Sequence, residues 1–233
     1  MSDAPELSVV VFAYDEEENL HAVLGELLAW LAVHEPKAEL VLVDDGSRDR
    51  TAERARELLA GTHQQVLQHE RNRGIGAALK TGVAAARGDW VTFMPADGQI
   101  EPAAIGTLRD EQKHGGADVV FSVYSDRNDG LKRKVTSWGV RAMIRALHGV
   151  KMRSDGPYLF RRSLFVPEAL PPDSFFLNFE FPIRMLAAGV RTSEVTIRCR
   201  PRRAGQSKSA SLRTIAIVGR ELVELRTRRG REG

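Results

Sequence analysis

Apolar positions along the first half of the chain follow two alternating periods. Leu7–Ala13 is a continuous β-branched and apolar run, which predicts a strand buried on both faces. In Glu16–His34 the leucines recur at spacings of three and four, which predicts an amphipathic helix. The acids Asp15–Glu18 lie at its start, where the helix dipole favours negative charge.

The same alternation repeats several times. It predicts strands at Glu39–Val43, Gln65–Gln68, Trp90–Met94 and Asp118–Ser122, and helices at Asp49–Ala60, Ile75–Ala86 and Pro102–Lys113. Strands that alternate with helices pair in parallel through right-handed crossovers. The fold class is therefore α/β, a doubly wound and mostly parallel sheet flanked by helices. Ligands of such sheets bind beyond the carboxyl ends of the strands, so the loops after Ala13, Val43 and Met94 are the informative ones.

Beyond Ser122 the pattern becomes less regular. It predicts a helix at Leu131–His148, a short element at Tyr158–Phe160, a helix around Phe179–Ala188, a strand at Thr192–Arg198 and a final amphipathic helix at Leu212–Arg228. No internal repeat or low-complexity linker marks a second domain. We expect one α/β domain over residues 1–210, followed by a basic C-terminal helix and tail over residues 211–233.

Composition sets the compartment that we expect. A chain of 233 residues with 42% apolar content can bury one good-sized core. Cys199 is the only cysteine, so no internal disulfide can form, and a reducing cytoplasm fits. The acidic start of the chain is unlike a signal peptide, and no apolar run reaches the roughly 18 residues that span a membrane.

The net charge of +3 hides an asymmetry, because residues 191–233 hold twelve Lys or Arg and four Asp or Glu. This basic stretch predicts contact with phosphate, from nucleic acid, anionic lipid or a nucleoside diphosphate, unless it is simply a solvated tail. The final helix carries Leu212, Ile215, Val218, Leu222 and Leu225 beside arginines. That stripe suits either an anionic membrane surface or packing on its own domain or a homodimer partner.

Two loops after predicted strands carry carboxylates. Asp44-Asp45-Gly46-Ser47 puts two adjacent acids at a strand end, which suits a donor-rich ligand such as a nucleobase, a ribose or a cation. Ordinary turn and helix-capping chemistry is an equal alternative there. Asp97 and Gln99 follow the fourth predicted strand, Trp90–Met94, and their oxygens suit a hard cation bound to a diphosphate, although a helix-capping Asp would look similar.

Two further segments suit phosphate. Gly74-Ile75-Gly76 enters a helix that also carries Lys80, and its backbone N–H groups can approach phosphate, which by itself is a weak signal. Residues 200–208 combine arginines, a lysine, a hydroxyl and a flexible glycine, which suits a loop that closes over a diphosphate, or else a basic linker. The acidic residues after the first strand would repel a pyrophosphate, which argues against a dehydrogenase. A nucleotidyltransferase is a weaker alternative, because its glycine- and arginine-rich phosphate loop should follow the first strand.

Taken together and in order, these motifs resemble the family 2 glycosyltransferases of the GT-A fold, in particular the dolichol-phosphate mannosyltransferase and polyprenyl-phosphate sugar transferase branch. The resemblance covers about residues 7–210 and rests on seven motifs that are specific only as an ordered set. They are Ala13-Tyr14-Asp15-Glu16, Asp44-Asp45-Gly46-Ser47, Asn72–Gly82, Ala96-Asp97-Gly98-Gln99, Ser154-Asp155-Gly156, Glu180 within Asn178–Phe181, and Arg202-x-x-Gly205-x-Ser207-Lys208.

The resemblance implies a role for each set of residues. The nucleotide of the donor would be held by Ala13, Tyr14, Glu16, Asp45, Gly76, Lys80, Asp97, Ser207 and Lys208. A Mg²⁺ or Mn²⁺ ion would lie at Asp97 and Gln99, and an acceptor phosphate at Arg133 and Ser137. Asp155 and Glu180 would face the sugar or the acceptor, and Arg202 would stabilise the leaving diphosphate.

The implied reaction inverts the anomeric carbon of a GDP-mannose or UDP-glucose type of donor and delivers the sugar to a polyprenyl phosphate or a hydroxyl group. The expected partners are the donor, a lipid-phosphate or glycan acceptor and a peripheral contact at the inner face of the membrane, without nucleic acid. A hydroxyl acceptor would need Asp155 or Glu180 as a base, whereas a phosphate would not.

Three departures from the family pattern bear on this function. Pro95 stands where the metal motif usually has a carboxylate, Val123 stands where the lipid-phosphate branch usually has arginine, and the transmembrane helices of many relatives are absent. The first leaves an alternative open, a nucleotide-sugar-binding pseudoenzyme with a regulatory or scaffolding role.

Overall fold

The computed structural model describes residues 4–125, 131–154, 156–171, 173–201 and 212–232, without the side chains of residues 131–136, 212–216 and 231–232. The strands are β1 (Leu7–Ala13), β2 (Glu39–Asp44), β3 (Gln65–Gln68), β4 (Trp90–Pro95), β5 (Val119–Tyr124), β6 (Leu159–Arg161) and β7 (Thr192–Ile197). The helices are α1 (Glu17–His34), α2 (Thr51–Leu59), α3 (Ile75–Ala85), α4 (Ala103–Gly115), α5 (Leu131–His148), α6 (Leu177–Ala187) and α7 (Leu212–Glu232), with short 3-10 turns at Arg162–Leu164 and Pro167–Ala169. The α/β prediction is confirmed, and the element boundaries differ from the expected ones by a few residues.

One seven-stranded sheet forms the centre, in the order β3-β2-β1-β4-β6-β5-β7. Every neighbouring pair is parallel except those of β6, which runs antiparallel to both β4 and β5. The short element expected at Tyr158–Phe160 is this strand, displaced by one residue. The sheet is therefore mixed, with β6 inserted into an otherwise parallel order.

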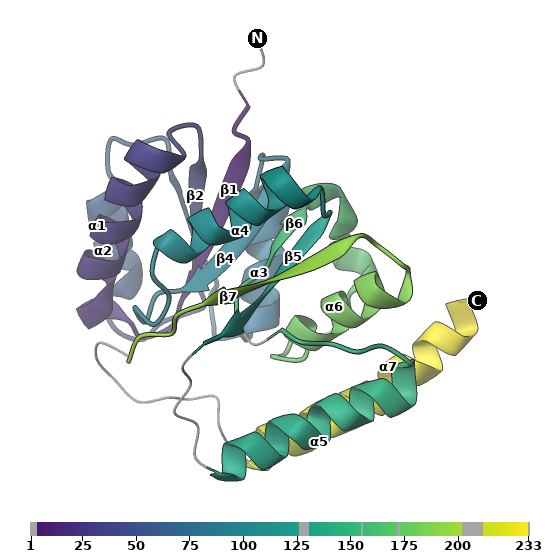
Figure 1. Cartoon of the computed structure of the whole chain (residues 1–233). Helices are drawn as coiled ribbons and strands as arrows, with labels where there is room; N and C mark the ends of the chain where they lie inside the picture. The colour runs from purple at the N-terminus through teal and green to yellow at the C-terminus, as the bar shows by residue number, and fades with distance from the viewer. Residues whose placement is uncertain (1–3, 126–130, 155, 172, 202–211, 233) are drawn as a thin grey trace.

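Helices cover both faces of the sheet (Figure 1), which explains the continuous apolar run of β1. Val9 and Val11 point to the core shared with α1, α2 and α4, whereas Val10 points to the core shared with α3 and α6. Because successive side chains of a strand point to opposite faces, a strand buried on both needs apolar residues at consecutive positions.

A third cluster joins α5, α6 and α7, which lie together beside the sheet (Figure 1). Val218, Leu222 and Leu225 of α7 are at most 5% exposed. Of the alternatives for the stripe on the final helix, packing on its own domain is therefore what these three residues do. Among the described residues, no helix is long and apolar enough to cross a membrane.

The buried carboxylate of Glu39, at the start of β2, joins β1 to the segment that precedes β4. Glu39 is 1% exposed and accepts hydrogen bonds from the Ser8 hydroxyl at 2.7 Å and from Nε of Arg87 at 2.8 Å. The backbone N–H of Gly88 adds a contact at 3.3 Å. Burial alone would raise the pKa of Glu39, but the hydrogen bonds from Ser8 and Arg87 hold it below its usual value of 4.5.

Because the pKa of Glu39 is lower in the folded state, its carboxylate stabilises the fold above pH 4.5, and this contribution is lost as the pH falls through the folded value. We expect Glu39→Gln to lower the free energy of unfolding at pH 7 by about 1 to 3 kcal/mol and to flatten its decline in acid. Urea unfolding between pH 3 and pH 7 measures both effects. A variant with an unchanged acid slope would show that Glu39 does not carry this linkage.

Candidate active site

The carboxyl ends of β1, β2 and β4 meet at one point, because hydrogen bonds tie their following loops together. The N–H of Asp45 donates to the carbonyl of Ala13 at 2.8 Å, and the N–H of Ala96 donates to that of Phe12 at 3.0 Å. The loops that carry the predicted nucleoside-binding and metal-binding residues therefore lie next to each other. This is the edge at which a doubly wound sheet binds its ligands.

Reciprocal hydrogen bonds join the loop after β1 to the loop after β2. The N–H of Asp15 donates to Oγ of Ser47 at 2.9 Å, and the N–H of Arg48 donates to Oδ1 of Asp15 at 2.8 Å. Asp15 has a φ of 52°, in the left-handed region that few residues other than glycine adopt. These bonds hold that conformation, which fixes the half-buried Tyr14 and the buried Glu16 on the rim.

The two acids at the end of β2, Asp44 and Asp45, have different surroundings. Asp44 is fully buried and accepts hydrogen bonds from both the hydroxyl and the N–H of Ser47. Burial raises the pKa of Asp44, and the Ser47 hydrogen bonds oppose that rise. Turn chemistry, one of the two alternatives from the sequence, therefore accounts for Asp44.

Asp45 organises the segment that leads into α3. Its Oδ1 lies 2.7 Å from Nδ1 of His69 and accepts the N–H of Arg73, and its Oδ2 accepts the N–H of Gly74 at 2.8 Å. Nε2 of His69 in turn lies 2.9 Å from the Thr81 hydroxyl. Asp45 is 4% exposed, and its hydrogen bonds hold the segment between β3 and α3, the Asp45 wall of the site. Direct contact of Asp45 with a nucleoside stays a prediction.

Gly76 and Lys80 face another segment of the chain. A Cβ on Gly76 would lie 2.5 Å from the carbonyl oxygen of Ser174, so only glycine fits there. The ammonium of Lys80 is 2.9 Å from Oδ1 of Asp173, whose carbonyl accepts the N–H of Ala77. Burial would raise the pKa of Asp173, but Lys80 and Arg73 hold it below its usual value. Here the start of α3 contacts the protein itself, and phosphate binding by Gly76 and Lys80 stays a prediction.

The turn after β4 carries the candidate metal ligands. Asp97 is 7% exposed, and its Oδ1 accepts the N–H of Gln99 at 3.0 Å. Gly98 has a φ of 75°, which closes the turn. Pro95, the last residue of β4, offers no side-chain ligand. Among the described residues, no group of three His, Cys, Asp or Glu is arranged to hold a metal ion.

The chain that follows β7 and leads into the basic segment pairs with this same turn. Cys199 forms a β-bridge with Ile100, and the N–H of Arg200 donates to the carbonyl of Gln99 at 2.9 Å. The guanidinium of Arg200 then reaches Glu101 at 2.6 Å and Glu26 at 3.2 Å. Arg202, Ser207 and Lys208 lie outside the described residues, and Arg202 follows two residues after the contact of Arg200 with the candidate metal turn.

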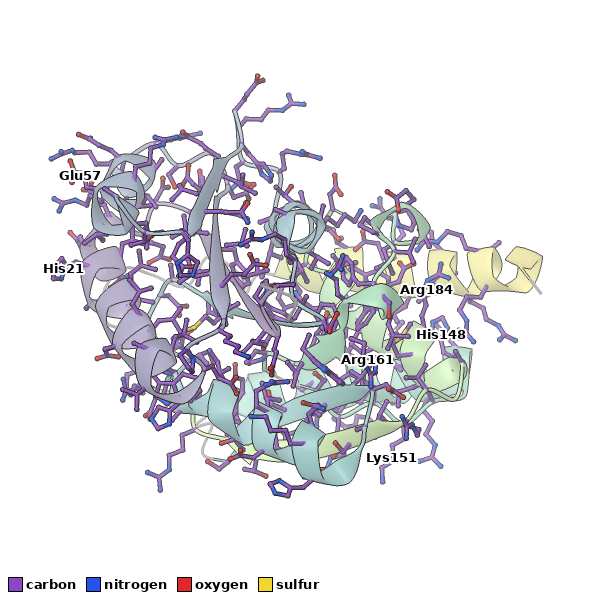
Figure 2. All side chains as sticks on the ribbon, turned by 90° about the horizontal axis from the view of Figure 1, so that it is seen from above. His21, Glu57, His148, Lys151, Arg161 and Arg184 are labelled. Atoms are coloured by element: carbon purple, nitrogen blue, oxygen red, sulfur yellow. The ribbon has the colours of Figure 1, made fainter. Side chains whose placement is uncertain are left out.

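The residues predicted to face the sugar or the acceptor lie on other elements. Glu180 on α6 is fully buried and pairs with Arg184 at 2.9 Å and with Arg228 of α7 at 2.7 Å. Figure 2 labels Arg184 and His148 on the side opposite His21 and Glu57. The ion-pair alternative weighed for Glu180 is thus present, and its role as a base stays a prediction.

Asp155 lies outside the described residues, although the N–H of the next residue, Gly156, contacts the carbonyl of Ser122 in β5 at 3.4 Å. Arg133 and Ser137 lie in the first half of α5. The side chain of Arg133 is not described, and that of Ser137 is half-buried.

His69 and Asp173 are site residues that the sequence reasoning missed. His69 directly follows β3, so the rule that directed attention to the other strand ends could have found it. Asp173 lies in an irregular loop with no such signal.

Comparison with known proteins identifies the class. The model of the family "Glycosyl transferase family 2" matches residues 8–166. The chain is 30% identical over 222 residues to dodecaprenyl-phosphate galacturonate synthase of Rhizobium johnstonii, covering 91% of this chain and 64% of that protein. It is 31% identical over 220 residues to undecaprenyl-phosphate 4-deoxy-4-formamido-L-arabinose transferase of Pectobacterium atrosepticum, covering 94% and 67%. The chain thus spans about two thirds of the length of these relatives.

Solved structures agree on the fold. Glucosyl-3-phosphoglycerate synthase of Mycobacterium tuberculosis, in complex with Mn²⁺, UDP and glucosyl-3-phosphoglycerate, superposes with a TM-score of 0.70 at 24% identity, covering 95% of this chain and 78% of that one. The same enzyme with Mg²⁺ and UDP gives a TM-score of 0.71 at 21% identity, covering 95% and 78%. The fold is GT-A.

The chain therefore belongs to glycosyl transferase family 2. Within that family it falls on the polyprenyl-phosphate sugar transferase branch, as the sequence motifs predicted.

Proposed function

We propose that the protein transfers a sugar from a nucleoside-diphosphate sugar to the phosphate of a polyprenyl phosphate, with inversion at the anomeric carbon. One observation carries the proposal: the loops after β1, β2 and β4 lie next to one another at the carboxyl edge of the sheet. The Arg200–Gln99 hydrogen bond joins the start of the basic segment to the last of these loops, the candidate metal turn. The names of the curated relatives support the acceptor class.

The donor nucleoside would lie against Tyr14, Glu16 and the Asp45 wall. A UDP-type donor is supported by the solved neighbours that contain UDP, and a GDP-type donor follows from the resemblance to dolichol-phosphate mannosyltransferases. The base of the nucleotide would be read by the rim that the Asp15–Ser47 and Arg48–Asp15 hydrogen bonds hold in place.

The residues present fit a divalent ion that binds together with the diphosphate. Mg²⁺ is commonly bound by one or two carboxylates plus phosphate oxygens, and the chain supplies the Asp97 carboxylate. The side-chain amide of Gln99, the second predicted ligand, has its nitrogen 4.0 Å from Sγ of Cys199. Such an ion, when bound, neutralises charge on the departing diphosphate. Because Pro95 replaces a second carboxylate, the protein's own share of the ligands is small, and we expect the ion to bind weakly without nucleotide.

The protein's own residues would act on the acceptor phosphate and on the leaving diphosphate. An oxygen of the acceptor phosphate forms a bond to the anomeric carbon as the bond to the diphosphate breaks, and the electron pair leaves with the diphosphate. Arg202 and Lys208 would stabilise that developing charge. A phosphate acceptor is already anionic at pH 7, so it needs positioning by Arg133 and Ser137 but no base.

The surroundings of Glu180 favour a phosphate acceptor over a hydroxyl group. Its carboxylate is paired with Arg184 at 2.9 Å and with Arg228 of α7 at 2.7 Å. To act as a base towards a substrate hydroxyl group, Glu180 would have to give up one of these ion pairs. Val123, half-buried in β5, leaves the acceptor phosphate one arginine fewer than the branch usually provides.

Pro95 also favours a second candidate, a pseudoenzyme that binds nucleotide sugar without transfer. Calorimetric titration with GDP- and UDP-sugars, with and without Mn²⁺, measures binding, and a donor-hydrolysis assay measures turnover. We expect the titration to show binding of one of these nucleotide sugars in the presence of Mn²⁺, and we expect its sugar to be transferred to short-chain polyprenyl phosphate. Binding without hydrolysis or transfer would replace the enzyme by the pseudoenzyme, and no binding of any nucleotide would refute both.

A further inference from the structure

The register of β2 and β3 places His69 beside Asp45. The two strands pair in parallel with Asp44 opposite Gln68, so the residues that follow them, Asp45 and His69, stand at the same level of the carboxyl edge. The backbone N–H of His69 also donates to the carbonyl of Asp44 at 2.9 Å, which extends the ladder by one hydrogen bond. The sheet itself therefore brings the two side chains together.

The imidazole ring of His69 is held at both of its nitrogens. Its Nδ1 lies 2.7 Å from Oδ1 of Asp45, and its Nε2 lies 2.9 Å from the hydroxyl of Thr81 on α3. Because a carboxylate only accepts, Nδ1 carries the hydrogen of the first bond, and Nε2 of the neutral ring accepts the hydroxyl hydrogen of Thr81. Thr81 is fixed in turn, since Leu79 and Val83 of the same helix pack in the core. The ring cannot rotate without losing a buried hydrogen bond.

The hydrogen bonds to Asp45 fill its two oxygens unequally. A carboxylate has about four lone-pair positions, two on each oxygen. Within the described part of the chain, Oδ1 accepts two donors, His69 and the N–H of Arg73 at 2.9 Å, whereas Oδ2 accepts one, the N–H of Gly74 at 2.8 Å. The open acceptor position is therefore on Oδ2. If His69 did not donate, each oxygen would keep one open position.

This difference matters to a nucleobase that lies against the Asp45 wall. The uracil of a uridine nucleotide presents a single N–H at its pairing edge, between two carbonyl oxygens, and a single N–H needs one open acceptor. Guanine presents two adjacent donors, a ring N–H and an amino group, which match both oxygens of a carboxylate as a bidentate pair. Since His69 fills Oδ1, one guanine donor would be buried without a partner, which costs free energy.

We propose that His69 is a positioning residue of the donor site, which fills one oxygen of Asp45 and thereby selects a uridine nucleotide over a guanosine nucleotide. The inference deepens the proposed function and rests on it, because the nucleoside is taken to lie against the Asp45 wall. It decides between the two donor types that the proposed function leaves open. His69 acts through Asp45 and does not contact the reacting atoms.

Calorimetric titration of the purified chain with UDP and with GDP, each in the presence of Mn²⁺, measures the ratio of the two dissociation constants. We expect the wild type to bind UDP at least about tenfold more tightly than GDP. His69→Leu removes both ring nitrogens and should reduce this preference by roughly tenfold.

Two amide variants separate the two hydrogen bonds of the ring. His69→Asn keeps an N–H near the position of Nδ1, so it should retain the preference for UDP within about threefold. His69→Gln places its amide near the position of Nε2, so it should lose the preference as His69→Leu does. If His69→Leu does not fold, this pair alone decides. His21→Leu is the matched control, because it makes the same substitution at an exposed position of α1.

A merely structural His69 would weaken the binding of UDP and GDP alike, so an unchanged ratio in His69→Leu and His69→Gln would overturn the proposal. A wild type that prefers GDP would also overturn it, as would a preference that His69→Gln retains and His69→Asn loses. The proposed function survives each of these results, because a nucleotide still binds. Binding of neither UDP nor GDP to the wild type would refute the donor class of the proposed function together with this inference.

Discussion

Replacing Asp97 with asparagine is expected to lower the turnover number for sugar transfer by roughly 100- to 1,000-fold while the fold stays intact. The substitution removes the negative charge that would hold the divalent ion against the diphosphate. It keeps an oxygen that can accept the Gln99 N–H, the hydrogen bond that closes the turn at 3.0 Å. The loss should therefore appear in activity and in Mn²⁺ stimulation, with the melting temperature nearly unchanged.

Steady-state transfer at several Mn²⁺ concentrations measures this effect, with Asp110→Asn on the exposed side of α4 as the matched control. A companion variant sharpens the test. Pro95→Asp restores a second carboxylate at the end of β4, and we expect it to lower the Mn²⁺ concentration for half-maximal activity by roughly tenfold. If Asp97→Asn is as active as the wild type, Asp97 is not the metal ligand.

The sequence predicts the elements of this fold because burial leaves a periodic trace. Val9, Val10 and Val11 are all buried, two against one helical layer and one against the other, and that arrangement forces the continuous apolar run of β1. Strand order leaves no comparable trace. The pattern at Tyr158–Phe160 indicates a short element, but nothing local shows that it enters the sheet between β4 and β5 in the antiparallel sense.

The candidate site divides in the same way. Asp45 and Asp97 are identifiable because each follows a buried strand, and parallel strands bring their carboxyl ends together. The partners of Asp45 come from distant parts of the chain, with His69 following β3 and the Arg73 and Gly74 amides preceding α3. Their contact depends on how loops fold back in three dimensions. The final helix is a further case, since its stripe suits either a membrane surface or a core, and the packing of Leu222 and Leu225 distinguishes them.

Arg202→Ala is expected to lower the turnover number by roughly 100-fold or more while changing the dissociation constant of the nucleoside diphosphate much less. The reason lies in when its charge is needed. The diphosphate gains negative charge as the glycosidic bond breaks, so a guanidinium beside it stabilises the transition state more than the bound donor. The Arg200 N–H donates to the carbonyl of Gln99 in the candidate metal turn, and Arg202 follows two residues later in the sequence.

Arg203→Ala provides the matched control, because it removes the same charge one position along, at an unspecified position of the Arg202-x-x-Gly205-x-Ser207-Lys208 motif. Turnover comes from the transfer assay, and binding comes from calorimetry with the nucleoside diphosphate. If Arg202→Ala weakens binding and leaves turnover at saturating donor unchanged, Arg202 holds the ground state and does not assist departure. Partial recovery in Arg202→Lys would show that charge supplies part of the effect and that the forked geometry of arginine supplies the rest.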